Sequence, residues 1–113
     1  MKIKLRDREG IAIAALEGRL QQGVGDVAMR DPVNDLLASG HTKILLDLSG
    51  VPSIDSSGVG ELVASLKVAE ELEAQLKILQ VSDGVRHVLD ISRILPLFET
   101  FGDEDDAVAV FSD

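Results

Sequence analysis

The chain has 113 residues, of which 20 are acidic and 11 are basic, and it carries a formal net charge of −9 and no cysteine. This is the length of one domain, so residues 1–113 are predicted to form a single domain. The acidic balance argues against a nucleic-acid partner, because such binding depends on Lys and Arg at the phosphates. No apolar run reaches the ~20 residues that span a bilayer. We therefore expect a cytoplasmic protein without direct membrane insertion, and the absence of cysteine fits a reducing compartment.

The beginning of the chain predicts a β-hairpin followed by a loop. Residues 2–8 have a basic side chain at every second position, which is typical of a strand with one face in water. Glu9-Gly10 predicts a tight turn, and the apolar residues 11–16 predict the returning strand. Residues 18–25, which are rich in glycine and glutamine, are interpreted as a loop.

A helix and a buried strand are predicted next. The apolar spacing over residues 26–39 predicts a helix, in which Pro32 should cause a kink or a restart. Gly40 is expected to end this helix. Residues 43–48 form a nearly continuous apolar run between turn residues, as expected for a buried central strand. Residues 49–53 predict the turn after that strand.

The second half of the chain predicts helices that alternate with strands. Apolar residues recur every three or four positions after the motif at residues 55–58, which predicts the longest helix. Residues 75–81 predict another buried strand, and Ser82 is expected to cap a short helix after it. An edge strand over residues 97–101 and a helix over residues 103–111 follow. Because this order requires crossover connections, we predict a small mixed α/β domain. Its sheet should have about four to five strands, including the N-terminal hairpin, with three to four helices around it.

Few side chains of this sequence suit catalysis or metal binding. His41 is interpreted as a solvated loop residue and His87 as a surface helix residue, without the partners that a catalytic triad or a metal site needs. The acidic residues 103–106 are interpreted as complements to a helix dipole. Ser56 lacks the preceding glycine that a hydrolase nucleophile elbow requires. We therefore predict no catalytic residue, no metal and no cofactor, and a protein that is not an enzyme.

Residues 55–60 carry the strongest functional signal. Ser56 and Ser57 stand where a helix begins, and serines there commonly act as N-terminal caps, an interpretation that stays open. Gly58 and Gly60, however, each cost a helix up to ~1 kcal/mol relative to alanine, which favours a turn shaped for access by another protein. An accessible serine at a helix N-terminus suits phosphorylation, because the phosphate faces the positive end of the helix dipole.

Residues 43–60 also resemble a family signature. Their sequence, KILLDLSGVPSIDSSGVG, is similar to the signature of the bacterial anti-sigma factor antagonists, the proteins that define the STAS domain. Residues 18–20 resemble the glycine-turn segment of that family, and residues 81–92 resemble its strand, turn and third helix. The resemblance covers nearly the whole chain and implies a STAS-like fold.

This resemblance implies a partner-switching function. The unphosphorylated protein would bind an anti-sigma factor, which is also a serine kinase with a histidine-kinase-like ATPase fold, and would so release a sigma factor for transcription. The kinase would phosphorylate Ser56 and the phosphorylated form would let go, until a metal-dependent serine phosphatase reverses the modification. Asp55 would position or activate the hydroxyl, Ser57 would stay unmodified, and Gly58 and Gly60 would permit close docking.

Two positions differ from the family pattern, and three others suggest an interface. Gln21 stands where many members have an acidic residue, and Pro32 lies in a helix that is usually continuous. Helical spacing places Glu61, Ala64 and Val68 opposite the core-facing side of the long helix, where we expect a partner interface. Scattered surface residues are the alternative interpretation.

Two other functions stay open at this point. The chain could be a constitutive STAS-type subunit of a signalling scaffold or of a lipid or anion transport system, in which Ser56 is only a helix cap. A serine-dependent hydrolase acting at Ser56 is the enzyme alternative, which the absent elbow glycine and the absence of a suitable base disfavour.

Overall fold

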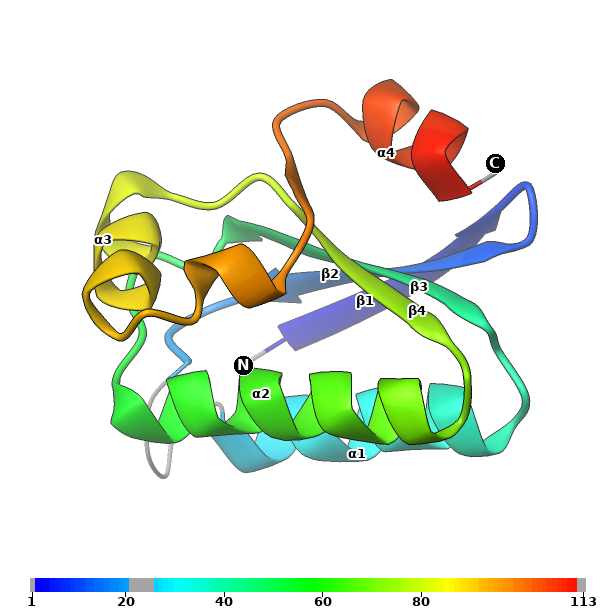
Figure 1. Cartoon of the computed structure of the whole chain (residues 1–113), viewed down its shortest axis with the longest axis horizontal. Coiled ribbons are helices and arrows are strands. Elements are labelled where there is room, and N and C mark those ends of the chain that lie inside the picture. Colours follow the sequence, from blue (N-terminus) through cyan, green and yellow to red (C-terminus); the bar gives the residue numbers. More distant parts are fainter. Residues whose placement is uncertain (1, 21–25, 112–113) are drawn as a thin grey trace.

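The computed structural model describes residues 2–20 and 26–111 and contains one sheet with helices on both faces (Figure 1). In chain order the elements are β1 (Lys2–Arg8), β2 (Ile11–Glu17), α1 (Asp26–Ala38), β3 (Lys43–Gly50), α2 (Ser56–Glu71), β4 (Gln75–Leu79), α3 (Asp83–Ile91), the 3-10 turn η1 (Leu95–Leu97), β5 (Thr100–Phe101) and α4 (Glu104–Phe111). The predicted α/β class, with a mixed sheet, is confirmed.

The sheet has the strand order β1-β2-β3-β4-β5. β1 and β2 form the predicted antiparallel hairpin, in which Arg8 pairs with Ile11. The two turn residues between them, Glu9 (φ 54°) and Gly10 (φ 82°), both have positive φ, as in the two-residue turns that match the twist of paired strands. The pairs β2–β3, β3–β4 and β4–β5 are parallel. β3 is therefore the central strand, as its apolar sequence predicts.

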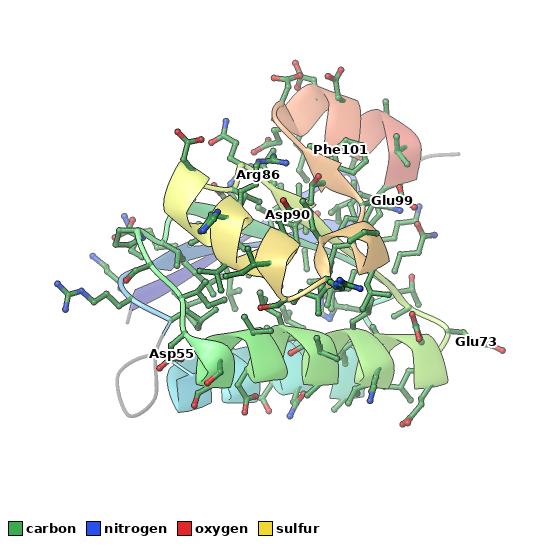
Figure 2. All side chains as sticks on the ribbon, turned by 60° about the vertical axis from the view of Figure 1, so that its left-hand side comes forward. Asp55, Glu73, Arg86, Asp90, Glu99 and Phe101 are labelled. Carbon is green, nitrogen blue, oxygen red and sulfur yellow. The ribbon has the colours of Figure 1, made fainter. Side chains whose placement is uncertain are left out.

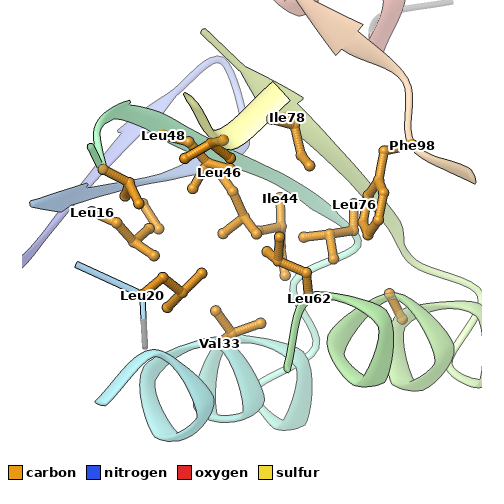
Figure 3. Packing of buried hydrophobic residues seen from close by; sticks show 14 of the residues in the cluster. Leu16, Leu20, Val33, Ile44, Leu46, Leu48, Leu62, Leu76, Ile78 and Phe98 are labelled. Atoms are coloured by element: carbon orange, nitrogen blue, oxygen red, sulfur yellow. The ribbon is translucent and has the colours of Figure 1, made fainter. Parts of the chain in front are cut away.

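The larger hydrophobic core lies between the sheet and helices α1, α2 and α3. Figure 3 shows the part of this core between the sheet, α1 and α2. Successive side chains of a strand point to opposite faces of the sheet, so alternate residues of β3 enter this core. The buried residues that form it include Ala14, Leu16, Leu20, Val33, Leu37, Ile44, Leu46, Leu48, Leu62, Ala69, Ile78, Val85 and Leu89. The three helices therefore depend on one face of the sheet for their burial.

A smaller core lies on the opposite face, beneath α4. It consists of Ile11, Ile13, Leu45, Leu79, Ala107, Val108 and Phe111. Lys77 is buried at its edge, where its Nζ lies 2.9 Å from Glu99 Oε2 and 5.3 Å from the centroid of the Phe111 ring. A buried ammonium group is tolerated where a carboxylate and an aromatic face compensate its lost hydration.

The basic face of β1 is covered in part, which corrects the expectation that this face meets water. Arg6 and Arg8 both donate to Glu104, and Arg8 also donates to Asp105 Oδ1 at 2.7 Å. Glu104, Asp105 and Asp106 lie in the first turn of α4, as the dipole interpretation requires. The first two have the additional role of holding α4 on β1.

The helix α1 runs from Asp26 to Ala38 without a break at Pro32, so the predicted restart is wrong. Proline removes one backbone donor from a helix interior. Val33 and Leu37, which follow it, are buried in the larger core, and this packing stabilises the helix across the proline. Gly40, with φ 90°, lies just past the end of α1, as predicted.

The two histidines have different environments. His41 is partly buried and its Nδ1 lies 3.1 Å from the carbonyl oxygen of Leu36, so the interpretation as a solvated loop residue is wrong. The chain folds back over the end of α1 at this point, where the same Leu36 carbonyl also accepts a hydrogen bond from His41 N at 3.1 Å. His87 is exposed on α3, as predicted.

Replacing Glu104 by glutamine tests the charge pairing between α4 and β1. Hydrogen bonds from Arg6, and to a smaller extent from Arg8, hold the pKa of Glu104 below its ordinary value. A carboxyl whose pKa is lower in the folded state than in the unfolded chain stabilises the fold at pH values above its unfolded pKa, which is about 4.3. This stabilisation is lost as the pH falls through the folded value. We expect Glu104→Gln to lower the free energy of unfolding by up to about 1 kcal/mol at pH 7, and by less at about pH 3, where the carboxyl begins to be protonated.

Urea unfolding at the two pH values measures this difference. Glu70→Gln is the control, because Glu70 is exposed on α2 and makes no ion pair with the described residues. A difference between Glu104→Gln and the wild type that is the same at both pH values would contradict the prediction.

Candidate functional site

The serine motif lies where the chain leaves the central strand β3 and enters α2. Ser56 is the first residue of α2 and is exposed. Its hydroxyl makes no hydrogen bond with any residue that the structure describes. Ser57, the next residue, is only partly exposed. Of the two serines, Ser56 is therefore the more accessible to another protein.

Asp55, at the start of α2 in Figure 2, caps this helix. Its backbone is extended, with φ −114° and ψ −173°, and its Oδ1 accepts a hydrogen bond from Gly58 N at 3.1 Å. Its carbonyl oxygen accepts from Val59 N at 2.9 Å. Both bonds are those of an N-cap residue. The interpretation of Ser56 and Ser57 as the caps is therefore wrong, because the preceding aspartate already fills that position.

Backbone hydrogen bonds to Leu20 fix the segment just before Ser56. Leu20 N donates to Ser53 O at 3.0 Å, and Asp55 N donates to Leu20 O at 3.2 Å. Leu20 also forms a parallel bridge with Ile54, and both side chains are buried. Residue spacing does not indicate this contact, because a single bridged pair has no periodicity.

The two glycines of the motif have different roles. A Cβ atom on Gly58 would lie 2.2 Å from Leu20 O and 2.7 Å from Ile54 Cγ1, whereas a Cβ atom on Gly60 would meet nothing within 4 Å. Gly58 is buried and Gly60 is exposed. The expectation that both permit partner docking is therefore wrong for Gly58, which the chain's own Leu20 covers. That Gly60 permits close docking of a partner stays a prediction.

The three residues predicted as an interface lie on the side of α2 next to α1. Glu61, Ala64 and Val68 line a shallow groove of about 200 Å³, together with Asn34 and Ser65. Ala64 is exposed and Glu61 is partly exposed, but Val68 is partly buried against the larger core. The expectation that all three lie opposite the core-facing side is wrong for Val68, because α1 packs beside α2 and extends the core to it.

Few charges surround the Ser56 hydroxyl in its own segment. Between positions 44 and 60 the charged residues are Asp47 and Asp55. Asp47 Oδ1 accepts a hydrogen bond from Ser49 N at 3.0 Å, within the end of β3. The described part of the chain contains no group of three or more His, Asp or Glu that could hold a metal ion. Nor does it contain a helix long and apolar enough to cross a membrane.

The family model of the STAS domain matches residues 2–107 of this chain. The chain belongs to the STAS domain family. A curated relative, the anti-sigma F factor antagonist of Paenibacillus polymyxa, is 22% identical to this STAS domain over 102 residues, which cover 88% of this chain and 87% of that protein.

Two solved structures share the fold of this STAS domain. That of a proposed anti-sigma factor antagonist from Thermotoga maritima has a TM-score of 0.91 and 21% sequence identity, and the match covers 98% of this chain and 95% of that one. That of the Bacillus cell fate determinant SpoIIAA in its phosphorylated form has a TM-score of 0.74 and 20% identity, and covers 97% and 99%. The predicted STAS-like fold is thereby confirmed.

The two departures from the family pattern have different outcomes in this STAS domain. Pro32 lies inside α1, which remains one helix. Gln21 lies outside the described residues, so its replacement of an acidic residue stays a difference in sequence.

Replacing each motif glycine by alanine tests whether Gly58 and Gly60 have the separate roles described above. Gly58→Ala forces a methyl group against the Leu20 carbonyl, so we expect it to lower the free energy of unfolding by about 1–3 kcal/mol. Gly60→Ala meets no neighbour and improves helix propensity, so we expect an increase of up to ~1 kcal/mol. Urea unfolding of both variants checks the pair, and a Gly58→Ala variant as stable as Gly60→Ala would refute the account.

Proposed function

We propose that this STAS domain is an anti-sigma factor antagonist whose binding is controlled by phosphorylation of Ser56. The unphosphorylated domain binds an anti-sigma factor and so releases a sigma factor for transcription. The observation that carries this proposal is the exposed Ser56 hydroxyl, which makes no hydrogen bond with the described residues while Asp55 caps the helix. The names of the Paenibacillus relative and of phosphorylated SpoIIAA support the same role.

The proposed partners are two proteins that act on Ser56. The anti-sigma factor is itself a serine kinase with a histidine-kinase-like ATPase fold, and a serine phosphatase removes the phosphate. The domain is then a binding module without catalytic residues or cofactor, and it works in the cytoplasm, where sigma factors act. The cap bond of Asp55 fixes the turn that presents Ser56, and Ser57 stays unmodified.

A phosphate on Ser56 disturbs a partner interface more than it disturbs the domain. It carries a charge of about −1.5 to −2 at pH 7. At the first residue of α2 this charge faces the positive end of the helix dipole, so the fold tolerates it. In a partner contact the same charge must be desolvated beside the Asp55 carboxylate, which weakens binding. It also roughly doubles the negative charge of positions 44–60, which hold only Asp47 and Asp55.

We propose that the partner contacts the side of α2 that begins at Ser56. Gly60 and Ala64 follow at intervals of four residues and are exposed, and residues so spaced lie on one side of a helix. Their small size lets a partner approach Ser56 closely. Glu61 and Val68 border this side at the groove next to α1.

Incubation with ATP and an extract of the native host should add one phosphate to the purified domain. Phosphopeptide mass spectrometry should locate it on Ser56. Ser56→Ala should abolish the modification, whereas Ser57→Ala should retain it, because Ser57 is only partly exposed. Full modification of Ser56→Ala would show that the assigned site is wrong.

Arginine at position 64 tests the docking side of α2. A long charged side chain there blocks close approach, so Ala64→Arg should weaken binding of the isolated kinase at least about tenfold, or about 1.4 kcal/mol. Ala109→Arg is the matched control, because Ala109 is an exposed alanine of α4, on the other face of the sheet. Calorimetry that finds equal affinities for the two variants would exclude this side of α2 as the interface.

A constitutive STAS-type subunit is the second candidate function. A sulfate transporter family protein from Wolinella succinogenes has a similar fold, with a TM-score of 0.73, 20% identity and coverage of 91% of this chain and 85% of that one. This candidate took Ser56 as a helix cap, a role that belongs to Asp55. Ser56→Asp discriminates between the two functions, because it should abolish partner binding in a switch and leave it unchanged in a constitutive subunit.

A further inference from the structure

Ser82 makes two hydrogen bonds that join α3 to the loop before Ser56. Its Oγ accepts from Val85 N at 3.3 Å, which caps α3 as the sequence predicts. The same hydroxyl donates to Val51 O at 3.0 Å. One side chain therefore ties the beginning of α3 to the loop that leads from β3 into α2.

This loop is held from two sides. Leu20 bonds to its backbone on one side. On the other side, Gly84 approaches so closely that a Cβ atom on it would lie 3.2 Å from Pro52 O. Apart from the single bridge to Leu20, residues 51–55 belong to no helix or strand. The contacts from the two sides therefore determine where Ser56 lies.

We infer that Ser82 is a positioning residue for the phosphorylation of Ser56, an inference that rests on the proposed function. In the transfer, a bond forms between Ser56 Oγ and the γ-phosphorus of ATP, and the bond from that phosphorus to the β,γ-bridging oxygen breaks. ADP leaves, and the hydroxyl proton passes to solvent. The attacking and leaving oxygens must lie roughly in line, and a displacement of ~1 Å can slow a reaction about a hundredfold. Ser82 acts through Val51, by holding the loop that carries the hydroxyl.

Two substitutions separate the tether from the helix cap. Aspartate caps helices as well as serine does, so Ser82→Asp keeps an acceptor for Val85 N. Its ionised carboxylate has no proton to donate to Val51 O and is repelled by that oxygen. Ser82→Thr keeps a hydroxyl for both bonds. We expect Ser82→Asp to lower kcat for Ser56 phosphorylation about ten- to hundredfold with little change in KM, and Ser82→Thr to stay within about twofold of the wild type.

Gly84→Ala tests the same role with the Ser82 hydroxyl intact. Alanine favours the helix over glycine, but its methyl group presses on the Pro52 carbonyl, so the loop must shift. We expect kcat to fall about three- to tenfold while the thermal unfolding temperature does not decrease. A rate that falls without a loss of stability separates positioning from damage to the fold.

The kinetics use ATP and the serine kinase isolated with the wild-type domain, and hydrogen exchange of the free domain supplies a second readout. The amides of Leu20, Asp55 and Gly58 donate hydrogen bonds that hold this loop and the start of α2. They should exchange at least about tenfold faster in Ser82→Asp than in the wild type, and at the wild-type rate in Ser82→Thr. Unchanged phosphorylation kinetics in Ser82→Asp would overturn the inference.

Failure of the proposed function has a different signature. If the wild-type domain is not phosphorylated at Ser56, the proposed function is wrong. The exchange rates then decide by themselves whether Ser82 holds the loop, and equal rates in Ser82→Asp and the wild type would refute that role as well.

Discussion

The backbone pairing between Leu20 and the loop before α2 is the constraint on which the serine motif depends. Leu20 both donates to this loop and accepts from it, so the direction of the chain is set before the helix begins. The first turn of α2 then rests against the Leu20 carbonyl, and only glycine at position 58 leaves room for that contact. With Asp55 engaged as the cap, Ser56 is the residue of this turn that remains exposed.

Acidic residues near the C-terminus form ion pairs on one face of the sheet. Much of the acidic excess near the C-terminus is paired, because Glu104 and Asp105 bind arginines of β1 and Glu99 binds Lys77. These pairs lie on the α4 side. The segment around Ser56 has few charges of its own. Such a segment suits a contact that one added phosphate can disrupt, because the phosphate greatly changes the charge of these positions.

Several elements follow from local patterns. The alternation of β1, the Glu9-Gly10 turn and the apolar run of β3 predict the hairpin and the central strand, because strand side chains have a period of two. Three- and four-residue spacing predicts α2. The errors arise where distant segments meet. Pro32 was expected to kink or restart α1, and the restart does not occur, because packing on the core outweighs the lost backbone bond. The basic face of β1 was expected in water, but α4 covers part of it.

The motif Asp55-Ser56-Ser57-Gly58, its place between a buried strand and a helix, and the family resemblance follow from the order of residues alone, because each depends on neighbours along the chain. Tertiary contacts decide the rest. They make Asp55 the helix cap, give Gly58 a role in packing and leave the space beside Gly60 unoccupied. They also bring Ser82 to Val51, 31 positions away. Such contacts join residues with no fixed spacing, so they arise only when the sheet has placed the ends of its strands side by side.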